Sequence, residues 1–79
     1  MTGRSLRAKR AAAGIPGHAV CRVAKMSRAK LSDIERENVA ATPEQIQRLD
    51  AAIDQIVQTK RHVERLAKAA GLSLIGTQL

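Results

Sequence analysis

The stretch "GIPGHAVCRVAKMSRAKLSDIERE", residues 14–37, contains start and stop signals for two short helices that follow each other closely. Proline suits the first turn of a helix and clashes later, so Pro16 or Gly17 opens the first helix, which we expect to end near Lys25. Ser27 can cap the second helix, because its hydroxyl can accept from a free backbone amide of the first turn. Both helices are too short to be stable alone, so the stretch predicts two helices packed on a common core.

The second of these helices has two unlike sides. Spaced at 100° around the helix axis, its residues fall on a core side, an outward side and two flanks. The core side holds Ser27, Leu31 and Ile34, the outward side Ala29, Ser32, Asp33 and Arg36, and the flanks Arg28 and Lys30. The outward side is therefore small and polar.

A further helix is predicted upstream of this pair. Leu6 and three alanines indicate a helix from about Ser5 to Ala13, with Ser5 as the candidate N-cap and Gly14 as the stop. Nothing along the chain reads as a strand of useful length. We therefore expect an all-α fold built from short helices, followed by the longer helical segment described next.

The segment after residue 41 begins with a strong helix start, "TPEQ" at residues 42–45. Thr42 is the expected N-cap, Pro43 suits the first turn, and Gln45 completes a capping box. No glycine or proline follows until Gly71, which permits one helix of about 28 residues. Alternatively, the polar run "QTKRH" at residues 58–62 divides the segment into two helices.

Apolar residues recur along this segment with helical spacing, most clearly at Ile46, Leu49, Ile53 and Ile56. Three short helices cannot cover a seam of that length, so we expect a second chain to pack on it. The expected dimer interface consists of Ile53, Ile56, Val63, Leu66 and Ala70. The chain thus divides into a helical domain over residues 1–57 and an oligomerising extension over residues 58–79, whose apolar tail from Leu72 could also dock on a protein partner.

Positive charge is concentrated in the first half of the chain. The 79 residues include 14 lysines and arginines against 7 acidic residues, a net charge of +7. Residues 1–40 hold nine basic and three acidic side chains, whereas residues 41–79 hold five and four. An excess confined to one half favours a surface for a polyanion, although a solvated basic terminus would have the same composition.

Composition also excludes several classes of function. The chain has no Phe, Tyr or Trp on which single-stranded bases could stack, so if the polyanion is a nucleic acid, duplex DNA is favoured. No apolar run is long enough to cross a bilayer. One cysteine and two histidines form no cluster with metal-ligand spacing, and no catalytic set converges, so we expect no metal, no cofactor and no enzyme. Cys21 is interpreted as a small buried hydrophobe.

Residues 14–37 resemble the DNA-binding core of the Cro and phage-repressor (XRE-type) helix-turn-helix family. They align without a gap, and the matching positions are Gly14, Ile15, Val20, Cys21, Ser27, Arg28, Leu31, Ile34 and Glu35. Upstream, "LRAKRAAAG" resembles the first helix of the family, so the similarity covers about residues 4–57. The resemblance implies a lambda-repressor-like fold in which residues 1–57 bind duplex DNA. It also implies a structural ion pair between Arg10 and Glu35.

In such a fold the helix after the turn enters the major groove and reads base edges with its first half and outward side. The implied base-reading residues are Arg28, Ala29, Ser32 and Asp33, with the guanidinium of Arg28 suited to guanine. The implied phosphate-binding residues are Arg4, Arg7, Gly17, His18, Lys25, Ser27, Lys30, Arg36 and Asn38. Exposed basic residues without a ligand remain the alternative interpretation of Arg28 and Lys30, as does an exposed side chain for His18.

The chain departs from the family pattern at three places. Lys25 and Glu37 stand where the family has glycines that follow helices, and Gly17 with His18 replaces longer polar residues. We expect the helix before Lys25 to end without a left-handed residue, because lysine adopts that conformation at a cost. After the next helix we expect Asn38 to take the left-handed conformation.

The implied function is that of a transcriptional repressor. It would bind a palindromic operator in double-stranded DNA as a homodimer, in the cytoplasm of a bacterium or a phage-infected cell. Two alternatives remain open. One is the antitoxin of a toxin–antitoxin pair, which binds its operator and also holds the toxin through the tail. The other is an architectural protein that binds duplex DNA through charge, without regard to sequence.

Overall fold

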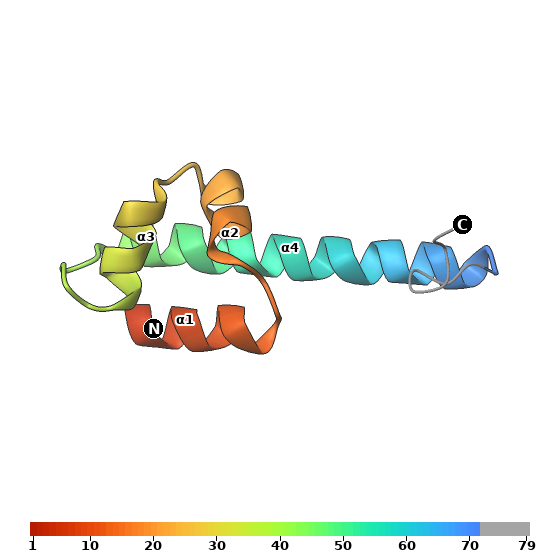
Figure 1. Ribbon diagram of the computed structural model, residues 1–79, viewed down its shortest axis with the longest axis horizontal. Coiled ribbons are helices and arrows are strands. Elements are labelled where there is room, and N and C mark those ends of the chain that lie inside the picture. Colours follow the sequence, from red (N-terminus) through yellow and green to blue (C-terminus); the bar gives the residue numbers. More distant parts are fainter. Residues whose placement is uncertain (72–79) are drawn as a thin grey trace.

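A computed structural model of the protein describes residues 1–71, which form four helices and no strand (Figure 1). The helices are α1 (Gly3–Ala12), α2 (Gly17–Ala24), α3 (Arg28–Glu35) and α4 (Pro43–Ala69). The predicted all-α class is confirmed. The three short helices surround the first half of α4, and its second half extends beyond them (Figure 1).

All four helices contribute to one hydrophobic core. Its buried members are Leu6, Ile15, Val20, Cys21, Ala24, Leu31, Ile34, Leu49, Ala52 and Ile53. Ile53 is 1% exposed, so its assignment to a dimer interface is wrong. The helical spacing identified Ile53 as an inward-facing residue, but the partners that cover it are α1 and α2 of its own chain, which the spacing does not specify.

Most helix starts follow the sequence signals. The Ser27 hydroxyl accepts from the Lys30 amide at 3.1 Å, and Thr42 with Gln45 forms the expected capping box. The start of α1 is different, because the helix begins two residues before the predicted Ser5. The Thr2 hydroxyl accepts from the Ser5 amide at 3.1 Å, so Thr2 is the cap.

Two residues without the freedom of glycine adopt the left-handed conformation, Lys25 with φ 56° and Glu37 with φ 60°. Both of our expectations for these turns are therefore wrong. After α3, the backbone amide of Asn38 donates to the backbone carbonyl of Asp33, and the backbone amide of Glu37 donates to that of Ile34. These two hydrogen bonds are the pair that defines a Schellman turn. In this turn the left-handed residue is the first one after the C-cap, so Glu37 adopts that conformation rather than Asn38.

The longer hydrogen bond of this turn, closed around a left-handed residue, also ends α1 and α2. The backbone amide of Ile15 donates to the backbone carbonyl of Arg10, and the amide of Met26 donates to the carbonyl of Cys21. Each bond closes a turn that contains one left-handed residue. At the end of α1 that residue is Gly14, with φ 69°, as the sequence predicts. Helices α1, α2 and α3 thus each end at a left-handed residue. Only at the end of α1 is that residue a glycine, which adopts the conformation without strain.

Helix α4 runs without interruption for 27 residues, so the alternative of two helices is wrong. Its packing on the core ends at Ile56 and Val57. Beyond them almost every side chain is exposed, including Val63 at 45% and Leu66 at 56%. The tail from residue 72 lies outside the described residues. Within the described part of the chain, no helix combines the length and apolar character that crossing a bilayer requires.

Two features hold α1 in place that sequence signals did not indicate. A Cβ on Gly3 would collide with the backbone carbonyl oxygen of Ile34, so α1 approaches α3 as closely as only glycine allows. At the other side, the Lys9 ammonium lies between two carboxylates of α4, 2.6 Å from Asp50 and 2.7 Å from Asp54. The hydrogen bonds that Lys9 donates to these carboxylates raise its pKa above the ordinary value.

Candidate nucleic-acid interface

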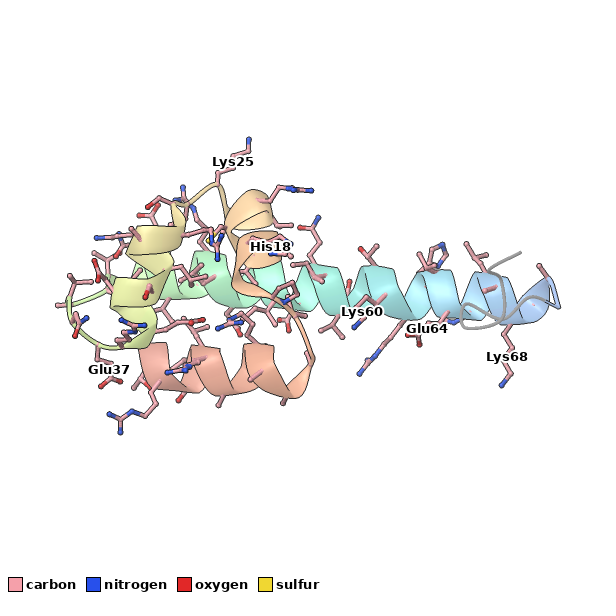
Figure 2. The ribbon with its side chains drawn as sticks, in the orientation of Figure 1. His18, Lys25, Glu37, Lys60, Glu64 and Lys68 are labelled. Atoms are coloured by element: carbon pink, nitrogen blue, oxygen red, sulfur yellow. The ribbon has the colours of Figure 1, made fainter. Side chains whose placement is uncertain are left out.

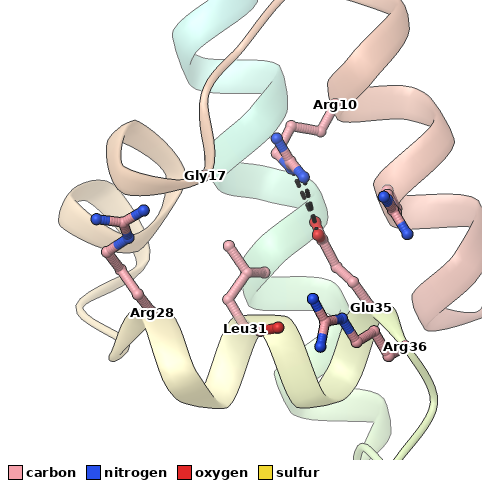
Figure 3. Close-up of a pocket in the computed structure, with 8 residues that line it drawn as sticks. Arg10, Gly17, Arg28, Leu31, Glu35 and Arg36 are labelled. Atoms are coloured by element: carbon pink, nitrogen blue, oxygen red, sulfur yellow. Dashed lines mark hydrogen bonds and ion pairs between the residues drawn. The ribbon is translucent and has the colours of Figure 1, made fainter.

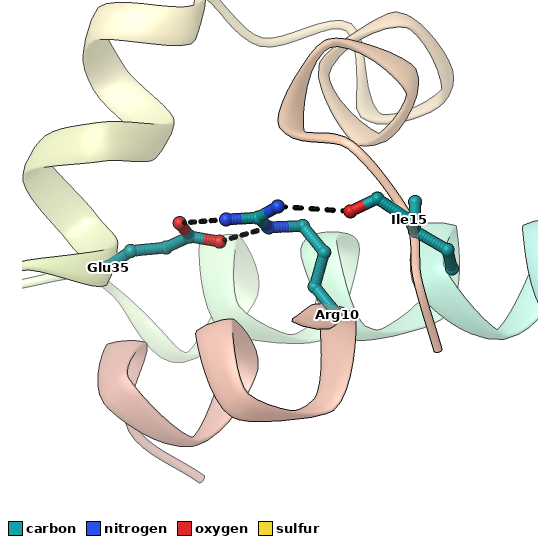
Figure 4. A network of polar contacts seen from close by, with 3 residues as sticks. All are labelled: Arg10, Ile15 and Glu35. Atoms are coloured by element: carbon teal, nitrogen blue, oxygen red, sulfur yellow. Dashed lines mark hydrogen bonds and ion pairs between the residues drawn. The ribbon is translucent and has the colours of Figure 1, made fainter. Parts of the chain in front are cut away.

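Helix α3 is fixed by an ion pair with α1 (Figure 4). The Arg10 guanidinium donates from Nε and Nη2 to the two carboxylate oxygens of Glu35, at 2.8 and 2.9 Å. A third donation, from Nη1 to the backbone carbonyl of Ile15, is 3.0 Å long and reaches the loop before α2. The implied pair of Arg10 and Glu35 is thus confirmed, and it joins three segments of the domain.

This pair is shielded from water, with side-chain exposures of 18% for Arg10 and 8% for Glu35. The hydrogen bonds to Glu35 raise the pKa of Arg10 further above its ordinary value. A bidentate arginine–carboxylate pair is geometrically specific, because both groups are planar and their atoms match. It therefore fixes how α3 is oriented relative to α1 and α2.

Next to the ion pair lies a pocket of about 240 Å³ between α1, the start of α2 and α3 (Figure 3). It is lined by Arg7, Arg10, Gly17, Arg28, Leu31, Ser32, Glu35 and Arg36. Four arginines thus meet around a single carboxylate, although they are up to 29 residues apart in sequence. Sequence reasoning named Arg7, Arg28 and Arg36 separately but did not place them around one space.

The arginines of this pocket differ in what they bind. The guanidinium of Arg10 is occupied by Glu35, but within residues 1–71 the guanidinium groups of Arg7, Arg28 and Arg36 pair with no carboxylate. Guanidinium groups match the planar, bidentate oxygens of phosphate well. The pocket also opens at Gly17, where the free amides of the first turn of α2 leave a partial positive charge. Its chemistry therefore suits a phosphate oxygen.

The predicted base-reading residues occupy the side of α3 that the core leaves uncovered. Arg28 and Ala29 are exposed, and Ser32 and Asp33 are half-buried. Figure 3 shows the side chain of Arg28 extending from the first turn of α3 towards α2. Arg28 is thus placed at the border between the outward face of α3 and the arginine pocket, where it can reach either a base edge or a phosphate.

The remaining predicted phosphate-binding residues do not lie in the pocket. Arg4, His18, Lys25, Ser27 and Asn38 are exposed, and Lys30 is half-buried. Lys25 lies at the turn between α2 and α3 and points away from the molecule (Figure 2). Asn38 lines a separate groove of about 440 Å³ beside Met1 and Val39. None of these side chains lines the arginine pocket.

The predicted core role of Cys21 agrees with its position. Its side chain is buried among the core residues, and burial raises the pKa of the thiol. Within residues 1–71, no group of three or more His, Cys, Asp or Glu side chains is arranged to hold a metal ion.

Three contacts that shape the site carried no clear signal in the sequence. They are the hydrogen bond that Arg10 donates to the Ile15 carbonyl, the close approach of Gly3 to α3, and the salt bridges of Lys9 with Asp50 and Asp54. Asp50 and Asp54 are four residues apart and therefore share one face of a helix, which is the only hint of that contact.

Comparisons with models of known protein families, with curated proteins and with solved structures found no match for this chain. The resemblance of residues 14–37 to the Cro and phage-repressor family therefore stays a prediction.

Proposed function

We propose that the protein is a sequence-specific regulator that binds double-stranded DNA through α3, in the manner of the Cro and phage-repressor family. The main support is the arginine pocket beside α3, where Arg7, Arg28 and Arg36 have no carboxylate partner among the described residues. A surface that gathers unpaired guanidinium groups next to a small, polar helix face can hold a phosphate and present side chains to base edges together.

In this proposal α3 lies in the major groove with its first turn nearest the bases. Arg28 contacts guanine, and Ala29, Ser32 and Asp33 meet the neighbouring base edges. Arg7 and Arg36 bind the adjacent backbone phosphates. The shielded pair of Arg10 and Glu35 does not contact DNA but fixes the orientation of α3 relative to α1 and α2.

One domain of this size covers about one half-site, so we propose that two copies bind a palindromic operator in the cytoplasm and block transcription. The antitoxin alternative shares the same DNA site and adds a protein partner for the tail from Leu72. That tail lies outside the described residues, so no structural observation favours this alternative.

Selection of bound sequences from a random duplex library tests the proposal. We expect a palindromic consensus whose affinity exceeds that of random duplex by about a thousandfold or more. A preference below about tenfold would contradict it and favour the architectural alternative, in which charge alone holds the duplex.

Single substitutions test the division of labour inside the site. Arg28→Ala should reduce the preference for the selected operator by about 10- to 100-fold while random-duplex binding changes little, because a base contact discriminates between sequences. Arg7→Ala should weaken binding to all duplexes and reduce the salt dependence by about one phosphate contact. Arg65→Ala, far along α4, is the matched control and should change neither quantity. Equal effects of Arg28→Ala on both duplexes would contradict the assignment.

A further inference from the structure

The second half of α4 has an apolar stripe that no part of residues 1–71 covers. The stripe consists of Val63, Leu66, Ala67 and Ala70, and we call it the distal stripe. Val63 and Leu66 are 45% and 56% exposed, and they are two of the few large hydrophobic side chains on the surface of the described residues. A stripe of this kind on a charged helix is the usual mark of a helix that packs on another.

The basic residues of this half lie on the opposite side of the helix. At 100° per residue, the distal stripe spans about 100° of arc, and Arg61, Arg65 and Lys68 centre on the side facing away from it. Lys60, which lies closest to the stripe, donates to the Ala13 carbonyl at 3.5 Å and so points toward the end of α1 (Figure 2). A helix can therefore pack on the stripe without burying a charge.

We infer that the distal stripe binds the distal stripe of a second copy of this chain, with the two α4 helices antiparallel. The stripe offers a large side chain, Leu66, next to the smaller Val63 and Ala67, and two such stripes can interdigitate. In an antiparallel pair centred near residue 65, Leu66 of each copy inserts between Val63 and Ala67 of the partner. An acidic partner protein would instead select the basic side of the helix.

The antiparallel direction follows from what covers the first half of α4. The line of the helix that bears Val63 and Ala70 continues backward through Ile56 to Ala52. Ala52 is only 3% exposed, because the short helices of its own chain already lie on it. A parallel partner would run into these helices along its whole first half. An antiparallel partner extends past the C-terminal end of α4 and meets none of the three short helices of residues 1–71.

The overlap from Lys60 to Ala70 is about 11 residues, or about 16 Å of helix, which is shorter than a standard protein interface needs. Pairing through the described residues is therefore concentration-dependent, and binding to two half-sites on one duplex would strengthen it. The inference shares with the proposed function only the pairing of two copies. Measurements without DNA test it separately, so either can fail alone.

Sedimentation equilibrium of the full chain, without DNA, tests the interface. We expect a reversible monomer–dimer equilibrium between micromolar and millimolar concentration, and Leu66→Glu should weaken the dimer by at least about tenfold because it places a charge in an apolar contact. Arg65→Glu removes one positive charge and adds a negative one on the opposite side, and it should leave the dimer unchanged. Circular dichroism checks that both variants stay helical. A chain that stays monomeric throughout, or a dimer that Leu66→Glu does not weaken, would overturn the inference.

Orientation is tested by a distance measurement between spin labels. The label is attached at Ala51→Cys in a chain that also has Cys21→Ala, so that each copy has a single label. An antiparallel pair centred near residue 65 places the two labels about 42 Å apart along the axis, whereas a parallel pair places them at the same level of the axis. A distance well below about 42 Å would overturn the antiparallel arrangement.

Discussion

The two halves of α4 have the same helical spacing of apolar residues and opposite surroundings. Leu49 in the first half is fully buried in the core of the domain, and Leu66 in the second half is 56% exposed. The change occurs after Val57, where the packing of α1 and α2 ends. The periodicity of a segment thus predicts that it is an amphipathic helix, but what covers its apolar side depends on where the rest of the chain lies.

The largest expected difference between the halves concerns this pair of leucines. Leu49→Ala should lower the free energy of unfolding by about 3 kcal/mol, because it leaves a cavity in a closed core. Leu66→Ala should change it by less than about 0.5 kcal/mol at concentrations where the chain is monomeric. Urea titrations followed by circular dichroism measure both values. Similar losses for the two variants would show that the second half of α4 is packed in solution.

The two glutamates at positions 35 and 64 allow the same comparison for charges. Glu35→Ala leaves the shielded Arg10 without its partner and should cost about 2 to 3 kcal/mol of stability, at or below the cost for a fully buried pair. Glu64→Ala removes an exposed carboxylate and should cost less than about 0.5 kcal/mol. The same denaturation experiment measures both. A loss below about 1 kcal/mol for Glu35→Ala would mean that the pair orients α3 without stabilising the domain.

The left-handed residues at the helix ends give a third comparison, with expected stability changes of about 1 kcal/mol. Lys25→Gly and Glu37→Gly should each stabilise the domain by about 0.5 to 1 kcal/mol, because glycine adopts the left-handed conformation without strain. Gly14→Ala should destabilise it by about 1 kcal/mol for the same reason. Gly71 is also left-handed, with φ 74°, but ends the exposed half of α4. Gly71→Ala should therefore leave the global unfolding midpoint unchanged, whereas an equal shift would show that the halves unfold together.

The smallest expected effect concerns the contact of Lys9 with Asp50 and Asp54. Folding raises the pKa of Lys9 above its ordinary value of 10.5. The stabilising effect is thus fully present below that value and is lost as the pH rises through the folded pKa. Lys9→Met should be less stable than the natural chain at neutral pH, and the difference should disappear in strongly alkaline solution. Lys68→Met, in the second half of α4, should show no such pH dependence, and thermal melts across the alkaline range measure both.

Much of the fold was predictable from short stretches of sequence. The caps at Ser27 and Thr42 and the stop at Gly14 depend on residues within five positions of each other, so a short stretch of sequence identifies them. The length of α4 followed from the absence of glycine and proline. The left-handed conformations of Lys25 and Glu37 do not follow from residue preference, because the hydrogen bonds of the turn around each residue decide its conformation.

The sequence predicted which residues belong to the candidate site, but it did not predict how they are arranged in space. The charge asymmetry and the resemblance of residues 14–37 indicated which arginines to consider. That Arg7, Arg28 and Arg36 surround one pocket depends on how α1 crosses α3, which Gly3 and the ion pair of Arg10 decide.

The sequence alone determined where most helices begin, which side of each is apolar and where positive charge gathers, because these properties depend on neighbouring residues and on composition. The tertiary structure decided the rest. It placed Ile53 in the domain's own core and left Leu66 uncovered, although both belong to the same apolar pattern. It also brought a lysine and two aspartates together over more than 40 residues of chain. Such contacts join segments that are far apart in the chain, and neither segment alone indicates its partner. The packing of the whole chain decides which segments meet.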